Sequence, residues 1–246
     1  MTGAAATYLR TERTPLEPVS LAPGQVPATL SAAYQAVNRQ VRQDPQRWRG
    51  WKLGGTNHGS RRAFDVTMLY YGALEAGEIM ARPPAAPGFA LHEWKGEVEY
   101  ALRIAADGQG YDAWCAALEM PSSPIENLLE AGVNALVADR CAAGALVLGA
   151  VHPGPLPTLE GRVLRLEQDG ACLDAATAEN LTGHPARILA DFIALARSHG
   201  VAPRPGDWVA TGGVTACCPL RQGGLVTVRL DDRVELEFTL TSGAER

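Results

Sequence analysis

The segment from Lys95 to Ile104 constrains the fold of this chain more than any other feature. Glu97 and Glu99 are separated by a single residue, and a β-prone alternation of side chains follows from Tyr100. Residues two apart in a strand share a face, so both carboxylates project the same way. The alternation is typical of a half-buried strand, which places the two acids over the protein interior. Held together there, they would repel each other without a cation.

A divalent metal ion is the simplest partner for such a pair. Magnesium takes oxygen ligands from a few carboxylates and keeps positions open for water or substrate. We predict that Glu119, near the end of a second apolar segment, is the third ligand beside Glu97 and Glu99. The alternative is a solvated strand face, because glutamates are common on protein surfaces.

Lys52 is the second candidate for chemistry. It stands between Trp51 and Leu53 in a segment that otherwise has the composition of a buried strand. A lysine in that setting needs a carboxylate partner or a function, although its ammonium can also extend to solvent. Near a metal site it could orient an anionic substrate or move a proton. The pair Asp139-Arg140 is open to two interpretations, a surface ion pair or a part of the site.

Charge and hydropathy exclude several classes of partner. The chain has 22 basic and 27 acidic residues, a net charge of -5 and no run of lysine or arginine. We therefore expect neither nucleic acid nor an anionic membrane surface as a partner, and favour a small molecule. The longest apolar stretch, residues 142–151, is far shorter than a membrane span. We expect a cytoplasmic protein.

Hydrophobic periodicity predicts a β-rich α+β fold in which strands outnumber a few helices. The predicted helices cover residues 30–43, a segment from about 125, and 185–199; the predicted strands cover residues 48–55, 95–104, 145–149, 163–166, 225–230 and 234–240. We expect the organised chain to start near Ala28. Residues 1–81 form a predicted N-terminal layer and residues 82–246 a catalytic domain, unless the two are one continuous domain.

Six short motifs, in order along the chain, resemble the fumarylacetoacetate hydrolase superfamily. They are Gly-Trp-Lys-Leu-Gly at 50–54, Gly-Glu-Val-Glu at 96–99, Ala-Leu-Glu at 117–119, Val-Ala-Asp at 137–139, Gly-His-Pro at 183–185 and Gly-Asp-Trp-Val-Ala-Thr-Gly at 206–212. The motifs are most similar to the branch of 2-keto-4-pentenoate hydratases and 4-oxalocrotonate decarboxylases. The resemblance implies a β-rich roll or sandwich with peripheral helices, and a homo-oligomer.

The same resemblance implies a site and a reaction. It implies Mg²⁺ or Mn²⁺ bound by Glu97, Glu99 and Glu119, and we expect a 2-oxo acid or 2-hydroxydienoate whose double bond is hydrated. We assign the remaining roles as follows: Lys52 and Asp139 are catalytic, and Leu53, Tyr70, Arg140 and Thr177 contact the substrate.

Two departures from the family pattern predict an unusual substrate. Hydratases of this branch carry an acid directly before a Tyr-Gly pair, where this chain has Tyr70. The family's Asn-Ala-Ser-Ser after the aspartate is replaced by Arg-Cys-Ala-Ala at 140–143.

Other functions remain open at this point. Decarboxylation of an oxalocrotonate-type substrate needs the same metal. Hydrolysis of an acylpyruvate needs a histidine–glutamate dyad, for which the candidates are His58, or His92 beside Glu93. In a different class, the chain could be a catalytically silent partner subunit or a 2-oxo acid-binding protein.

Overall fold

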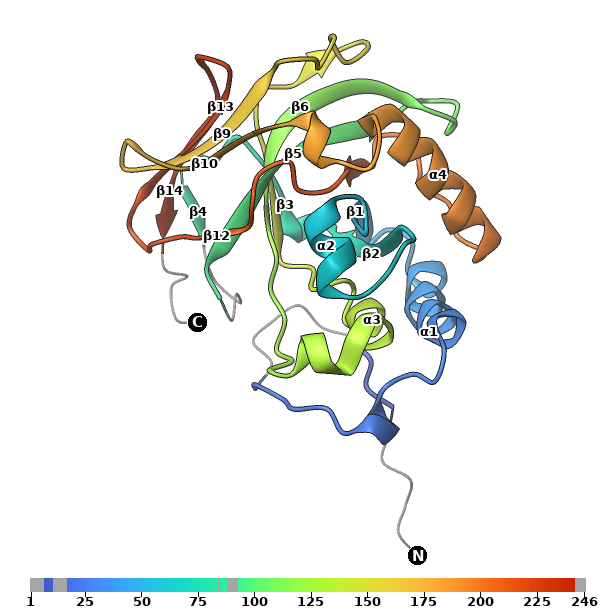
Figure 1. The fold of residues 1–246 in the computed structure, drawn as a ribbon. Coiled ribbons are helices and arrows are strands. Elements are labelled where there is room, and N and C mark those ends of the chain that lie inside the picture. Colours follow the sequence, from blue (N-terminus) through green and yellow to red (C-terminus); the bar gives the residue numbers. More distant parts are fainter. Residues whose placement is uncertain (1–6, 11–16, 84, 88–92, 242–246) are drawn as a thin grey trace, which may run out of the picture.

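Two β-sheets and a few helices make up the computed structural model, which describes residues 7–10, 17–83, 85–87 and 93–241 (Figure 1). Within these residues the larger sheet has nine strands, in the order β2-β1-β11-β5-β6-β7-β3, with β12 beside β5 and β8 beside β6. The strands are β1 (Trp48–Gly54), β2 (Tyr70–Glu75), β3 (Ile79–Ala81), β5 (Lys95–Ile104), β6 (Tyr111–Met120), β7 (Ala145–Leu148), β8 (His152–Pro153), β11 (Trp208–Ala210) and β12 (Cys218–Pro219).

The second sheet has five strands in the described residues, in the order β10-β9-β13-β14-β4. They are β4 (Ala85–Pro87), β9 (Val163–Gln168), β10 (Ala171–Thr177), β13 (Leu225–Leu230) and β14 (Arg233–Thr241). In β9 every second side chain is buried, including Leu164 and Leu166, because one face of the strand covers the core. The core cluster joins these leucines to Tyr100 and Leu118 of the larger sheet.

The α-helices are α1 (Leu30–Gln43), α2 (His58–Ala63), α3 (Leu128–Ala138) and α4 (Pro185–Ser198), with 3₁₀ turns at Pro23–Gln25, Ala76–Glu78 and Ala178–Asn180. Helix α1 begins after Thr29, whose side chain accepts a hydrogen bond from the backbone of Ala32. Helix α4 has Pro185 at its first position, where a missing N–H costs nothing. The predicted α+β fold and its two longest helices are confirmed.

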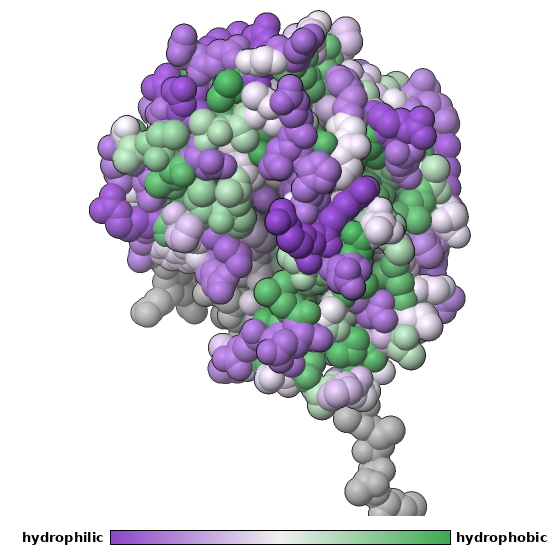
Figure 2. All heavy atoms as spheres, in the orientation of Figure 1, coloured by the Kyte–Doolittle hydropathy of each residue, from purple (hydrophilic) through white to green (hydrophobic). Residues whose placement is uncertain are grey.

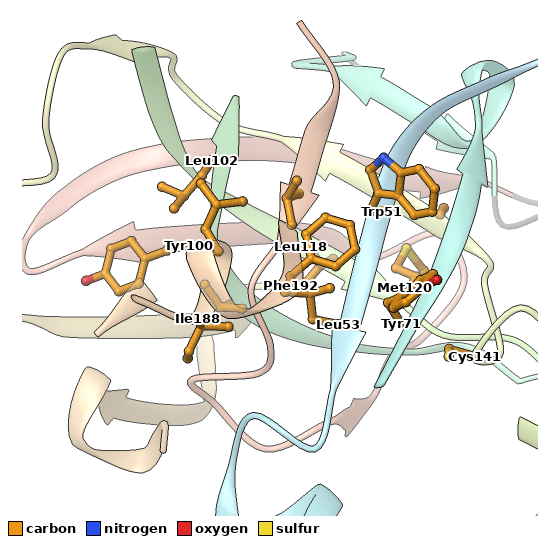
Figure 3. Packing of buried hydrophobic residues seen from close by; sticks show 14 of the residues in the cluster. Trp51, Leu53, Tyr71, Tyr100, Leu102, Leu118, Met120, Cys141, Ile188 and Phe192 are labelled. Atoms are coloured by element: carbon orange, nitrogen blue, oxygen red, sulfur yellow. The ribbon is translucent and has the colours of Figure 1, made fainter. Parts of the chain in front are cut away.

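Aromatic packing holds α4 against the larger sheet. Trp51 of β1 and Tyr71 of β2 both contact Phe192 of α4, with ring centroids 5.5 and 5.4 Å away (Figure 3). Each of these rings is buried, so hydrophobic burial fixes α4 against β1 and β2 of the sheet. Trp51 therefore occupies the packed side of β1, and the next residue, Lys52, points to the other side.

The expected start of the organised chain near Ala28 is wrong. The backbone N–H of Tyr8 donates to Gln25, and that of Arg10 donates to Ala138 at the end of α3. Strands β2 and β10 were also not among the predicted elements. The larger sheet contains β1, β2 and β3 together with β5, β6 and β7, so backbone hydrogen bonds join the segments on either side of residue 81.

Candidate metal centre and substrate cavity

Three carboxylates meet on one face of the β5–β6 hairpin. Glu97 lies directly opposite Glu119 in the antiparallel register, and Glu99 lies two residues further along β5. One oxygen from each side chain can be chosen so that all three lie within 4.8 Å of one another. The structure therefore brings together the three acids predicted from the sequence.

One ammonium group and one backbone N–H contact this cluster. Lys52 Nζ donates to Glu119 Oε1 at 2.8 Å, and the backbone N–H of Gly212 donates to Glu99 Oε2 at 2.7 Å. Both Glu99 and Glu119 are almost completely inaccessible to solvent. With all four groups ionised, three negative charges face one positive charge, which leaves a net charge of -2 in the protein interior.

Burial and repulsion disfavour this ionised state in the absence of a cation. Burial, followed by the charge of Glu119, raises the pKa of Glu97 from 4.5 to about 8. Burial and the neighbouring carboxylates raise the pKa of Glu99 as well. Burial lowers the pKa of Lys52, but the attraction of Glu119 and Glu97 outweighs it, so the net pKa is raised. The lysine therefore stays charged while the acids compete for protons.

The cluster fits a hard divalent cation. Its donors are all carboxylate oxygens, and its net charge of -2 is what a dication neutralises. Among the described residues, Glu119 Oε2 is a buried oxygen without a hydrogen-bond partner. Close backbone packing holds the Glu97 side chain, since a Cβ placed on Gly213 would lie 2.1 Å from Glu97 Oε2. Glu97, Glu99 and Glu119 would hold the ion.

The position of Lys52 depends on a short strand. In the larger sheet β11 lies between β1 and β5, and its last residue, Ala210, pairs with Lys52 on one side and Ala101 on the other. Beyond Ala210 the backbone N–H groups of Thr211 and Val214 still donate to β5, and Gly212 between them donates to Glu99. From this position in β1 the Lys52 side chain reaches Glu119.

A cavity of about 580 Å³ opens from the cluster. Lys52 and Glu97 lie at its inner end, and Leu53 and Tyr70 line its wall, where a substrate would contact them. Figure 2 shows hydrophobic surface in the lower part of the molecule, where α3 and its neighbours lie. A volume of this size is typical of small-molecule sites, which span roughly 300–1,000 Å³.

The structure places three predicted site residues outside this cavity. Arg140 is buried and makes two hydrogen bonds to Glu78, at 3.0 and 3.1 Å, so its guanidinium does not face a substrate. Asp139 accepts a hydrogen bond from the Tyr8 hydroxyl at 2.7 Å. Thr177 ends β10 and is not part of the cavity lining.

A left-handed turn explains the orientation of Arg140. Arg140, Cys141 and Ala142 have φ values of 55°, 56° and 54°, which turns Arg140 away from the cavity while Cys141 and Ala142 line it. Gly72 makes room for this turn, because a Cβ there would lie 2.0 Å from the Arg140 carbonyl oxygen. Sequence spacing gave no signal for three consecutive left-handed residues.

Two further contributors were missed. Asn57 donates to the Gly213 carbonyl oxygen at 3.0 Å and fixes the backbone beside Glu97. Arg10 donates to the carbonyl oxygens of Ser122 and Ala143 and so ties the N-terminal segment to the cavity wall. Of the histidine candidates, His58 is not part of the cavity lining, and His92 lies outside the described residues.

Sequence comparisons leave the chain without a match: no protein-family model and no curated protein matches it. Several solved structures, in contrast, have a similar fold. 4-Oxalocrotonate decarboxylase from Pseudomonas putida G7, complexed with calcium and acetate, superposes with a TM-score of 0.74 at 21% identity, over 86% of each chain. Its complex with magnesium and adipate gives 0.74 at 20% identity, again over 86% of each chain. Fumarylpyruvate hydrolase from Pseudomonas aeruginosa, with Mn²⁺ and pyruvate, gives 0.57 at 15% identity, covering 79% of this chain and 90% of the other.

The chain therefore has the fold of these decarboxylase and hydrolase structures, which agrees with the fold that the motif resemblance implied. At these identities the likeness concerns the fold, and the function must be argued from the site. No helix in the described part of the chain combines the length and apolar character needed to cross a membrane.

Proposed function

We propose that this protein is a metal-dependent lyase that acts on a small 2-oxo acid or its 2-hydroxydienoate form, with hydration of a carbon–carbon double bond as the preferred reaction. The observation that carries the proposal is the cluster of three converging carboxylates beside Lys52 at the inner end of a cavity. A scaffold without chemistry has no physical need for three converging carboxylates in its interior.

Each residue of the proposed site has its own role. When bound, a Mg²⁺ or Mn²⁺ ion would supply Lewis-acid stabilisation of negative charge on the 2-oxo group. Lys52 stays protonated, so its ammonium attracts the substrate carboxylate and can donate a proton near the reacting carbons. Asn57 holds the Gly213 backbone against Glu97. The buried ring of Tyr70 gives the cavity an apolar wall on the side of Lys52.

Decarboxylation is the second candidate. It is favoured by the TM-score of 0.74 to a 4-oxalocrotonate decarboxylase, above the 0.57 to the fumarylpyruvate hydrolase. Hydrolysis of an acylpyruvate ranks lower, because no histidine lines the cavity in the part of the chain that the structure describes. We further propose a homo-oligomeric protein, in keeping with sheet edges that need to be covered.

Magnesium binding tests the proposal directly. Glu99→Gln replaces a carboxylate by a neutral amide and should lower the affinity for Mg²⁺ by at least ~10-fold in calorimetry. Substitution of residues that only support metal ligands already has effects of about this size. The matched control is Glu237→Gln, an exposed glutamate on β14, which should bind as the wild type does. Equal binding by Glu99→Gln and wild type would contradict a metal at this cluster.

Product analysis then separates the reactions. The metal-loaded protein is incubated with a 2-hydroxydienoate, an oxalocrotonate and an acylpyruvate, with and without chelator. We expect turnover that chelator abolishes and magnesium restores. If no compound turns over or raises the melting temperature with metal present, the silent-subunit interpretation replaces the lyase.

A further inference from the structure

The cavity has two chemically different parts. Its inner end carries Lys52 and Glu97, which account for the carboxylate and 2-oxo group of a bound substrate if the proposed function holds. The wall beyond them is formed largely by apolar side chains from β1, α2, β2 and the segment that enters α3. These are Leu53, Phe64 directly after α2, Tyr70, Ile125, and Leu128 and Leu129 at the start of α3 itself.

The uncharged polar side chains of that wall are already engaged within the protein. The Ser60 hydroxyl donates to the carbonyl oxygen of Asn57 and accepts from the backbone N–H of Gly55. Ser123 Oγ accepts from the backbone N–H of Ile125, and the same hydroxyl is hydrogen-bonded to the Asp139 carboxylate. Asn127 accepts from the N–H of Leu21 and donates to its carbonyl oxygen. Donating groups of the wall are thus used to hold loops in place, and the wall offers a ligand mostly carbon surface.

The mouth of the cavity is acidic. Glu93, Glu126 and Glu130 are exposed and belong to its lining. Lys95 is the basic residue near these glutamates, and it forms an ion pair with Glu93. In the described part of the lining there is no arginine or histidine. A carboxylate at the far end of a substrate would therefore meet carbon and like charge, without a fork of donors to receive it.

Leu129 shows what the wall has in place of such a donor. It lies at the start of α3, lines the cavity and is 63% exposed, the highest value among the large hydrophobic residues of the described chain. An apolar ligand arm passing Leu129 would remove this surface from water, which is favourable.

From these features we infer that the substrate is a 2-oxo acid, or the related 2-hydroxydienoate, with one carboxylate and an uncharged apolar arm, and that the cavity discriminates against dicarboxylates of the same length. This inference rests on the proposed function for the head group and adds the chemistry of the tail.

Matched ligands test the inference. In the presence of Mg²⁺, binding of 2-oxohexanoate and 2-oxoadipate to the full chain is measured by calorimetry, with oxalate as a probe of the head-group site alone. The two oxo acids have the same carbon chain and differ only in the terminal carboxylate. We expect 2-oxohexanoate to bind at least ~10-fold more tightly, because an unpaired carboxylate near carbon and like charge is costly.

A charge variant makes the test sharper. Leu129→Arg puts a guanidinium at an exposed position of the wall, where the fold can accommodate it, and should shift the preference toward 2-oxoadipate by about tenfold. Val234→Arg is the matched control: this residue is 42% exposed on β14, outside the cavity lining, and its variant should keep the wild-type preference.

The outcomes are distinguishable. Oxalate binding with metal, together with equal or tighter binding of 2-oxoadipate by the wild type, overturns the inference about the arm and leaves the proposed function standing. Absence of binding by oxalate and by both oxo acids, with metal present, overturns both.

Discussion

Two buried charge clusters lie close to each other in this protein, and they differ in balance. The carboxylate cluster sets Glu97, Glu99 and Glu119 against Lys52. The arginine cluster, which we define as Arg10, Glu78, Asp139 and Arg140, sets two guanidinium groups against two carboxylates, all buried. One cluster is short of positive charge, and the other is neutral.

The difference separates function from architecture. Buried ions that neutralise each other need no outside partner, whereas an excess of buried charge is stable only when a ligand or protons compensate it. The arginine cluster holds the left-handed turn at 140–142, and this turn presents Cys141 and Ala142 to the cavity. The arginine cluster thus supports the wall of the cavity beside the carboxylate cluster.

The largest effect that tests this comparison is expected at Lys52. Lys52→Met should reduce turnover by about 10²- to 10⁴-fold, the range for a group that moves a proton. Mg²⁺ affinity should not fall, since the carboxylate cluster becomes more negative. Steady-state kinetics and calorimetry on the same sample measure both. A loss of metal binding that parallels the loss of turnover would mean that the lysine acts only on the fold of the site.

In the arginine cluster the expected effect is on stability. Arg140→Met leaves Glu78 buried without its partner and should cost about 3–5 kcal/mol in urea unfolding. The double variant Arg140→Met, Glu78→Met should recover much of this loss, because removing both charges ends the imbalance. If the single and double variants unfold at the same urea concentration, the pair is not what stabilises this region.

The carboxylate cluster predicts that the stability of the metal-free protein falls as the pH rises. The pKa of Glu97 is raised to about 8, so the metal-free folded protein binds a proton that the unfolded chain has released above about 4.5. The stabilisation from this proton is complete below pH 4.5 and is lost as the pH rises through 8. Unfolding in chelator should show Glu97→Gln gaining stability relative to wild type over this range. A difference that is constant with pH would argue against the repulsion.

The smallest effect is expected at an exposed ion pair. Arg187 and Asp191 lie one turn apart on α4, with side chains 76% and 54% exposed. Arg187→Ala should change the free energy of unfolding by no more than about 0.5 kcal/mol, because water screens the pair. Urea unfolding beside Arg140→Met gives the contrast between exposed and buried pairs. A loss above about 1 kcal/mol at Arg187 would remove the basis for treating burial as decisive.

Local patterns predicted β1, β5, β7, β9, β13 and β14, and they pointed to the carboxylates and the lysine of the site, but they left out other strands such as β2 and β10. Alternation predicted that Glu97 and Glu99 share a face, and the apolar neighbours of Lys52 predicted a buried lysine that needs a partner. These are properties of a strand, and they do not depend on the rest of the fold.

Properties of the tertiary structure could not be predicted in this way. Tyr8 and Asp139 form a hydrogen bond across 131 positions, and no spacing in the sequence links them. Arg140 was a candidate because a guanidinium can bind a substrate carboxylate. Three consecutive left-handed residues direct it toward Glu78 instead. The tight packing of Gly72 against this turn becomes visible only when both segments are placed.

The strand order also fixes when the site can form. The three carboxylates belong to neighbouring strands of one hairpin, β5 and β6, whose contacts are local in sequence and can form early in folding. Lys52 joins them through β11, which lies near the C-terminal end of the chain and inserts between β1 and β5. On the ribosome, the acids would meet long before the strand that seats the lysine has been synthesised.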